Sequence, residues 1–379
     1  MTYTFAPIDA ATEKPEKTAS PGDPWNERIG IAIVGVGRIS VNEVLPAFAV
    51  SRHVKPVALV SGDRAKALQI ARQYDIPESA VLDYTEYDKL AAMPEVQGVY
   101  IGLPNSMHAE YTIRAARAGK HVLCEKPMAN TVAECQDMID ACKAADRKLM
   151  IAYRRQYSPL ERALVRMVRE NKLGALREFT SVNSQNMGDP LHWRLKRALA
   201  GGGPLPDVGL YCINQARFLS GEEPVEVIGH TWSTPGDARF TEVEESCQFT
   251  LRFPSGFVAT CSTAYSAHKS QMYRLNASEA WAEMNPAYAY KGNRLRIARV
   301  EAGSEHSTEL QIDEGNQFAN ELDHFAQCVR MDREPHTPGE EGLQDQRIIE
   351  AIYASARSGQ PVKLTAPGRT RGPAPQDDA

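Results

Sequence analysis

The sequence predicts an α/β fold: a doubly wound parallel sheet followed by an α+β domain with a large, mostly antiparallel sheet. Apolar runs alternate with amphipathic stretches from residue 29 to about residue 153, which is typical of buried parallel strands separated by helices. Further along, apolar and polar residues alternate strictly, for example over 247–253, as in strands covered on one face. The length of 379 residues suits two or three domains of about 150 residues each.

In the first half, each buried strand is expected to lead into a helix. The strands are predicted at 29–34, 57–60, 98–103, 121–124 and 149–152, and the helices at 65–74, 109–118 and 132–145.

In the second half, a helix is expected to begin at Ser158-Pro159 and to end near Gly174. Ser158 suits the N-cap position, and Glu161 would complete a capping box. The further strands are predicted at 225–231, 247–253, 257–265, 273–277 and 294–300, and the further helices at 208–219, 317–329 and 343–358.

Composition excludes several classes of protein. Lys and Arg number 43 and Asp and Glu number 48, a net charge of −5, so a generally basic nucleic-acid binder is excluded. Apolar runs fall short of the roughly 18 residues that a membrane helix needs. The seven cysteines are scattered and form no CxxC pair, which argues against a metal site or a disulfide framework. The first 28 residues lack a secretory signal, so a cytoplasmic location is expected.

A glycine-rich turn directly follows the first strand. Gly35 and Gly37 allow a tight turn and the close approach of a pyrophosphate, and Arg38 and Ile39 lead into a helix. Ser40 stands where a third small residue is usual. This context favours a Rossmann dinucleotide-binding site over a plain strand–helix turn.

The end of the second strand distinguishes NADP from NAD. An NAD enzyme usually has an acidic residue there, which binds the ribose 2′-hydroxyl. Here the position is Ser61, with Arg64 and Lys66 close behind it and Arg38 in the glycine turn. A hydroxyl and cations can bind a 2′-phosphate, so NADP is favoured. The alternative is that Asp63 serves the ribose and the cations are solvated.

Two further loops follow strands of the predicted sheet. Residues 103–108 (Leu-Pro-Asn-Ser-Met-His) follow one strand, and Glu125-Lys126-Pro127 follows the next. Ligands of open α/β sheets bind at this edge. Lys126 could direct its ammonium at a substrate, although the pattern alone favours an ordinary surface lysine equally.

The stretch around the three glycines at 201–203 is the most unusual in the second half. Asp207 and Tyr211 follow it, four residues apart at the start of a predicted helix, which places both on one helical face. A phenol normally has a pKa near 10. A neighbouring lysine ammonium would favour the phenolate and make Tyr211 a usable base.

Together these motifs resemble the Gfo/Idh/MocA oxidoreductases from about residue 29 to residue 362. The resemblance rests on the glycine turn, the Pro-Asn-x-x-His loop, Glu125-Lys126-Pro127 and the glycine-rich segment that ends in Tyr211. It is most pronounced for the branch of glucose–fructose oxidoreductases and their aldose-using relatives, whose proline-containing arm reaches over the cofactor of a neighbouring subunit.

The resemblance implies roles for individual residues. Lys126 would orient the sugar hydroxyl, Tyr211 would accept and donate the proton, and Asp207 and Arg155 would contact the sugar. The implied NADP site comprises Gly35, Gly37, Arg38, Ile39, Ser61, Gly62, Arg64, Lys66, Tyr84, Leu103, Pro104, Asn105, His108, Glu125, Lys126, Trp193, Arg194 and Tyr211.

The predicted segments are therefore an arm (1–28), an NADP-binding Rossmann domain (29–153), a substrate and oligomerisation domain (154–364) and a loose tail (365–379). The predicted enzyme oxidises a cyclic aldose at C1 to an aldonolactone and reduces a second sugar, an aldose or a ketose, with tightly bound NADP. A simple NADP-dependent dehydrogenase is the first alternative, and a non-catalytic dinucleotide sensor is the second. The expected partners are sugars and further copies of the chain, in a dimer or tetramer.

Overall fold

The first sheet of the molecule is parallel, as predicted. The computed structural model describes residues 22–365, and within them this sheet has six strands in the order β3-β2-β1-β4-β5-β6. The strands are β1 (Ile29–Val34), β2 (Val54–Val60), β3 (Val81–Leu82), β4 (Gly98–Ile101), β5 (His121–Glu125) and β6 (Leu149–Ala152). All residues of β1, β4 and β6 are buried, because helices cover both faces of such a sheet.

The strand order reverses between β1 and β4. At such a reversal the loops that follow the two strands diverge and leave a crevice at the carboxyl edge of the sheet. The helical segments around this sheet are a π-helical turn (Ser40–Val44), α1 (Leu45–Ala47), α2 (Arg64–Gln73), a 3-10 helix (Tyr84–Ala92), a second short one (Asn105–Met107), α3 (His108–Arg117) and α4 (Val132–Ala144).

The second sheet is mixed but mostly antiparallel, which confirms the predicted fold class. Its order in the described part is β14-β13-β12-β11-β7-β10-β9-β8-β15, and only β7 and β10 pair in parallel. The strands are β7 (Leu176–Asn186), β8 (Glu226–Trp232), β9 (Ser246–Arg252), β10 (Val258–Ala264), β11 (Ser266–Ala277), β12 (Ala280–Met284), β13 (Leu295–Glu301), β14 (Ser304–Glu309) and β15 (Val362–Lys363). Burial alternates along β9 and β10.

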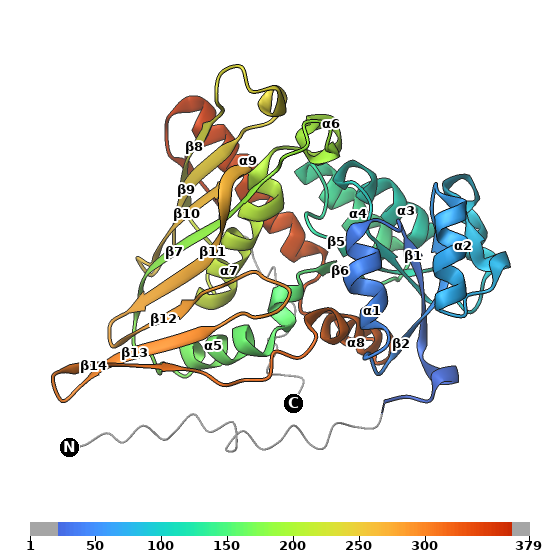
Figure 1. Ribbon diagram of the computed structural model, residues 1–379, viewed down its shortest axis with the longest axis horizontal. Coiled ribbons are helices and arrows are strands. Elements are labelled where there is room, and N and C mark those ends of the chain that lie inside the picture. Colours follow the sequence, from blue (N-terminus) through green and yellow to red (C-terminus); the bar gives the residue numbers. More distant parts are fainter. Residues whose placement is uncertain (1–21, 366–379) are drawn as a thin grey trace.

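Helices α7 and α9 pack on this sheet, on the side that faces the first sheet (Figure 1). The helical segments of this half are a 3-10 turn (Arg154–Tyr157), α5 (Pro159–Arg169), a 3-10 turn (Trp193–Leu195), α6 (Arg197–Ala200), a π-helical turn (Leu205–Gly209), α7 (Leu210–Ser220), a 3-10 turn (Ala238–Phe240), α8 (Gln317–Arg330) and α9 (Gly339–Ser358).

The chain returns to the first sheet near its end. The carboxylate of Asp323 on α8 accepts hydrogen bonds from the Ser51 hydroxyl (2.5 Å) and from the amides of Arg52 and His53 (2.9 Å each) just before β2. The amide of Ile151 in β6 donates to Thr337 O at 2.8 Å. Helix α8 and the segment that precedes α9 therefore hold the first sheet in place.

One local prediction was wrong, and one predicted helix begins earlier and in a different helical form. Ser158 is the N-cap of α5, but its side chain makes no capping hydrogen bond. Glu161 is buried instead and pairs with Arg155, because it lies on the inner face of α5. The helix predicted over 208–219 begins as the π-helical turn Leu205–Gly209 and becomes α-helical at Leu210.

Residues 1–21 of the predicted arm and 366–379 of the predicted tail lie outside the described residues. Across residues 22–365, no helix has both the length and the apolarity to cross a bilayer. The same residues contain no cluster of three or more His, Cys, Asp or Glu side chains that could hold a metal ion.

Candidate active site

The candidate site lies at the carboxyl edge of the first sheet, where the loops after β1, β4 and β5 meet. Gly35 in the first loop has φ +90°, and a Cβ atom there would lie 2.7 Å from Gly102 O in the second loop. Only glycine tolerates both conditions. The Ser40 hydroxyl donates to Gly35 O at 2.6 Å. Ser40, which stands where a third small residue is usual, therefore stabilises the turn.

Gly37 has a different environment. A Cβ atom there would have no neighbour nearer than Gly102 O at 4.0 Å, so protein packing does not require a glycine. The open space above the turn fits the close approach of a dinucleotide pyrophosphate. Arg38 is exposed beside it, and Ile39 is half-buried and packs on the core.

The end of β2 has the polar groups expected for a 2′-phosphate. The Ser61 hydroxyl accepts from the amide of Asp63 at 3.1 Å, and Asp63 accepts from the amide of Lys66 at 2.9 Å as the N-cap of α2. Since the Asp63 carboxylate is engaged at the helix end, it is less available to a ribose. The Lys66 ammonium donates to Val36 O in the glycine turn at 2.6 Å.

Two other predicted cofactor residues lie on different sides of this loop. Tyr84 lies against Gly62, where a Cβ atom would be 3.2 Å from the tyrosine ring. The guanidinium of Arg64 instead donates to Val81 O at 2.8 Å and lies 3.9 Å from Glu78. Arg64 therefore points towards β3, whereas Lys66 points towards the glycine turn.

His108 joins two of the loops. Its ring nitrogens lie 2.9 Å from Leu103 O and 2.9 Å from Pro127 O. Burial lowers the pKa of this imidazole, and the side chain is 1% exposed. His108 therefore fixes the loops after β4 and β5 and is badly placed to act as a base towards a substrate.

Asn105 links this edge to the second half of the chain, since its side-chain amide donates to Ala200 O at 2.9 Å. Pro104 precedes it as the N-cap of a 3-10 turn. Glu125 is directed into the core, where the Tyr100 hydroxyl donates to it at 2.7 Å and burial raises its pKa.

Lys126 and Asp207 form the centre of the site. The ammonium donates to Asp207 O at 2.9 Å and to Asp207 Oδ1 at 3.0 Å. The other carboxylate oxygen lies 3.1 Å from Arg194 Nε and accepts from the Tyr265 hydroxyl at 2.7 Å. Donors from three separate segments, one in the first half and two in the second, thus converge on one carboxylate.

The charges of this pair follow from their surroundings. Burial alone would lower the pKa of Lys126, but Asp207, Tyr211 and Glu125 together outweigh burial and raise this pKa above its ordinary value. Burial would likewise raise the pKa of Asp207, yet Arg194 and Lys126 hold it well below its ordinary value. Lys126 is therefore an ammonium at neutral pH and can donate a hydrogen bond but cannot accept a proton.

Tyr211 lies next to this pair, with the Lys126 nitrogen 4.7 Å from its ring centroid. Its hydroxyl accepts a hydrogen bond from Arg154 Nε at 3.1 Å. Sequence reasoning missed Arg154 and Tyr265. Arg154 directly follows Tyr153 at the end of β6, so the rule that sheet ligands gather at the carboxyl ends of strands could have identified it. No comparable signal marks Tyr265.

Arg155 is buried behind the site. It pairs with Glu161, and its Nε and Nη1 atoms have no hydrogen-bond partner among the described residues. It lines a cavity of about 10 Å³ together with Lys126 and Tyr211, which is about the size needed for one water molecule.

Trp193 stacks under the guanidinium of Arg194, with 4.4 Å between the guanidinium carbon and the ring centroid. The His192 ring also stacks on the Trp193 ring, with 6.0 Å between the two ring centroids. Because Arg194 also holds Asp207, this half-buried segment forms one wall of the site.

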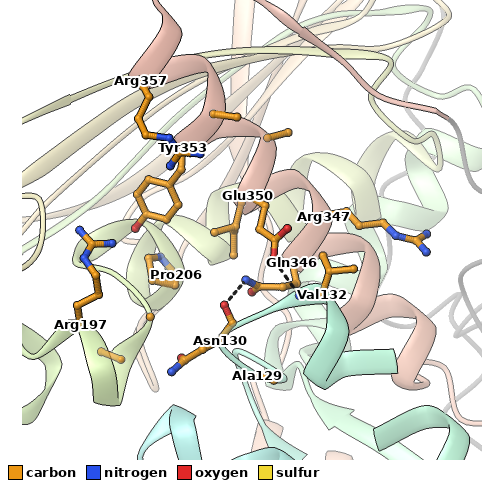
Figure 2. A pocket seen from close by; sticks show the side chains of 15 residues that line it. Ala129, Asn130, Val132, Arg197, Pro206, Gln346, Arg347, Glu350, Tyr353 and Arg357 are labelled. Carbon is orange, nitrogen blue, oxygen red and sulfur yellow. Dashed lines mark hydrogen bonds between the residues drawn. The ribbon is translucent and has the colours of Figure 1, made fainter. Parts of the chain in front are cut away.

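A pocket of about 630 Å³ lies elsewhere, between α9, α6 and the start of α4 (Figure 2). Asn130, Arg197, Tyr353 and Arg357 are among its lining residues, and the Gln346 side chain donates to Asn130 O at 2.8 Å. Lys126, Asp207 and Tyr211 are not part of its lining, so it is separate from the candidate site.

Comparison with known proteins agrees with this geometry. The family model described as "Oxidoreductase family, NAD-binding Rossmann fold" matches residues 29–153, and "GFO/IDH/MocA C-terminal domain" matches residues 162–283. Together they cover more than half of the chain. The chain belongs to the Gfo/Idh/MocA family of oxidoreductases. The predicted resemblance is thereby confirmed. Of the predicted NADP-dependent enzyme, the oxidoreductase with an NAD(P)-binding Rossmann fold is confirmed.

Individual members of the Gfo/Idh/MocA family are similar over nearly the whole length. A crystal structure of aldose–aldose oxidoreductase from Caulobacter crescentus, complexed with glycerol, is 44% identical, with a TM-score of 0.86 over 89% of this chain and 100% of that one. D-xylose 1-dehydrogenase [NADP(+)] of Haloarcula marismortui is 31% identical over 352 residues, 90% of this chain and 96% of the relative. Levoglucosan dehydrogenase complexed with NADH and levoglucosan, at 22% identity and a TM-score of 0.78, shares the fold.

Proposed function

We propose that this protein is a sugar oxidoreductase that oxidises a cyclic aldose at C1 to an aldonolactone with NADP. It then reduces a second sugar, an aldose or a ketose, to an alditol with the same bound nucleotide. The observation that carries the proposal is the buried Lys126–Asp207 ion pair beside the Tyr211 ring at the carboxyl edge of the sheet. The similarity to an aldose–aldose oxidoreductase supports the sugar substrate.

NADP is favoured over NAD by the residues at the end of β2. Ser61 and Lys66 would hold the 2′-phosphate, because a hydroxyl and an ammonium can bind a phosphate and a carboxylate would repel it. Gly35 and Gly37 would let the backbone approach the pyrophosphate. When bound, the nicotinamide supplies the acceptor and the donor of the hydride.

The side chains of this protein would transfer the proton of the sugar hydroxyl and stabilise the negative charge on its oxygen. Lys126 donates a hydrogen bond to the C1 oxygen and stabilises negative charge on it. Tyr211, as the phenolate, takes the proton of the C1 hydroxyl while the C1 hydride leaves, and the C1–O bond becomes the lactone carbonyl. In the second half-reaction the carbonyl carbon of the other sugar receives the hydride and Tyr211 returns the proton to its oxygen. Protons and electrons therefore balance over the two sugars.

The main alternative is a simple dehydrogenase that exchanges NADP at every turnover. The naming of two relatives as NADP-dependent D-xylose 1-dehydrogenases favours it. Both alternatives share the oxidation of the aldose and differ only in the fate of the reduced nucleotide.

The deciding experiment starts from protein that contains one equivalent of NADP and no free nucleotide. An aldose and a carbonyl sugar are added, and aldonate and alditol are measured over time. Equal amounts of both products, far above the amount of enzyme, are expected. If product formation stops after one equivalent and resumes only when NADP is added, the enzyme is a simple dehydrogenase.

A further inference from the structure

Arg154 is a buried cation in direct contact with the proposed acid–base group. It is 4% exposed, and its Nε donates to the Tyr211 hydroxyl at 3.1 Å. By contrast, the Lys126 ammonium is engaged with Asp207 and approaches Tyr211 only over the ring face. The two cations therefore serve different oxygens. Arg154 donates to the oxygen of Tyr211, whereas Lys126 is placed to donate to the oxygen of a substrate bound beside Asp207.

The other nitrogens of Arg154 are fixed by main-chain and amide oxygens. Nη1 donates to the Gln317 side chain at 2.7 Å and to Ala289 O at 3.3 Å, and Nη2 donates to Tyr288 O at 2.7 Å. Since a guanidinium is a planar, rigid fork, these three contacts set the direction of Nε.

Aromatic rings enclose the same guanidinium. Its carbon lies 4.6 Å from the ring centroid of Tyr290, 5.0 Å from that of Tyr211 and 5.7 Å from that of Phe318. Such contacts stabilise a cation and exclude water. Arg154 is thus held in one orientation by groups that come from α7, α8 and the segment before β13.

We propose that Arg154 is the positioning residue of Tyr211: it fixes the phenolic oxygen and stabilises negative charge on it while the proton is away. The inference rests on the acid–base role proposed above for Tyr211. An arginine stays charged at every relevant pH, so its effect is the same in both half-reactions. A hydrogen bond from a cation favours the charged form of its acceptor.

Several other charged or titratable groups surround the two side chains. Lys126 and Asp207 face Tyr211 from the loop after β5 and from the turn before α7, and burial raises the pKa of Tyr290 to about 12. Glu125 and Glu321 lie near Arg154, and burial raises the pKa of both.

The test compares Arg154→Gln, Arg154→Lys, Tyr211→Phe and the double variant Arg154→Gln/Tyr211→Phe. The rate of the first hydride transfer is measured in single turnovers with saturating NADP and aldose over a range of pH. Arg154→Gln should lower this rate about 10- to 100-fold, the effect of one hydrogen bond to a charged group, and should leave the sugar KM nearly unchanged. The rate of Arg154→Gln should begin to rise at a higher pH than the rate of the unaltered protein does. Arg154→Lys should restore part of the rate.

In the Tyr211→Phe background, the Arg154→Gln change should have no further effect, since its target oxygen is gone. Thermal unfolding and NADP binding are measured for each variant, and Arg154→Lys serves if Arg154→Gln does not fold. A normal rate and pH profile in Arg154→Gln, with a strongly reduced but measurable rate in Tyr211→Phe, would overturn the inference alone. Equal losses in both backgrounds would also overturn it. Normal activity in Tyr211→Phe would overturn the proposed function itself.

Discussion

At the scale of single residues, the neighbours of Lys126 favour its charged form and hold it in place. Its ammonium is bound to Asp207, and Asp207 has two further donors, Arg194 and Tyr265. A buried cation next to a fully satisfied carboxylate needs no reorganisation to stabilise charge on a substrate oxygen.

Replacement of Lys126 by Met should therefore lower kcat by about 10²- to 10⁴-fold, the typical effect of one positioned catalytic group. Folding and NADP binding should persist, because Arg194 and Tyr265 still hold Asp207. Steady-state kinetics and nucleotide titration check this. The control is Lys143→Met, which removes an exposed pair with Glu340 and should leave kcat unchanged. A near-normal kcat in folded Lys126→Met would remove Lys126 from the mechanism.

Substitutions of Ser61 test the proposed preference for NADP over NAD. Ser61→Asp should shift the ratio of the dissociation constants from NADP towards NAD, because a carboxylate accepts from a ribose 2′-hydroxyl and repels a phosphate of about −2. Ser61→Ala is the matched control, since it removes the hydroxyl without adding charge and should weaken NADP only slightly. Fluorescence titration with both nucleotides gives the ratio. If Ser61→Asp leaves it unaltered, the residue does not contact the ribose.

At the scale of elements, α7 and α9 are held together by a buried ionic cluster. Arg217 on α7 is 0% exposed and lies 3.1 Å from Glu341 and 2.5 Å from Asp345 on α9. It also lies 2.7 Å from Glu223. The cluster fixes α7, and the first residues of α7 include Tyr211.

Arg217→Met should destabilise the protein by about 3–5 kcal/mol, because it leaves buried carboxylates without their counter-charge. Chemical denaturation measures the free energy of unfolding. Arg252→Met, which breaks an exposed pair with Glu226, should cost less than about 1 kcal/mol. The further changes Glu341→Gln and Asp345→Asn in Arg217→Met should recover part of the loss. Equal effects of Arg217→Met and Arg252→Met would show that the cluster does not stabilise the helix pair.

At the scale of the whole molecule, the segment before β1 is fastened at the edge opposite the glycine turn. Asp23 accepts from His53 at 2.6 Å and pairs with Arg330 of α8. Its amide donates to Arg52 O at 3.0 Å. Residues 22–28 are therefore anchored to β2 and α8.

We expect residues 1–21 to contribute to the retention of NADP, as the resemblance to enzymes with such an arm implies. A chain that begins at Gly22 keeps the contacts of Asp23, so its thermal stability should match that of the full chain. Its nucleotide should dissociate faster, and its turnover with two sugars should begin to depend on added NADP. Stopped-flow displacement measures the dissociation rates. Identical rates in both forms would exclude a role of the arm in retention.

Much of the site could be predicted from the sequence, because it lies on the turns that follow buried strands. Apolar runs locate the strands, and the residues directly after them must meet at one edge of a parallel sheet. Gly35, Ser61, Lys126 and the fold class follow from this rule. The two-residue strand β3 escaped it because it is too short to have a periodicity. The division into domains at residue 153 stays a prediction.

Other features depend on contacts between residues far apart in the chain. The sequence places Asp207 and Tyr211 after a glycine-rich segment, but only the packing of the second half against the first brings Asp207 to Lys126. Whether Arg154 or Arg155 faces Tyr211 is likewise decided by the turn after β6 and by the oxygens of Tyr288 and Gln317. Local periodicity reports which side of an element is buried, whereas the partner of a buried charge is chosen by tertiary packing alone.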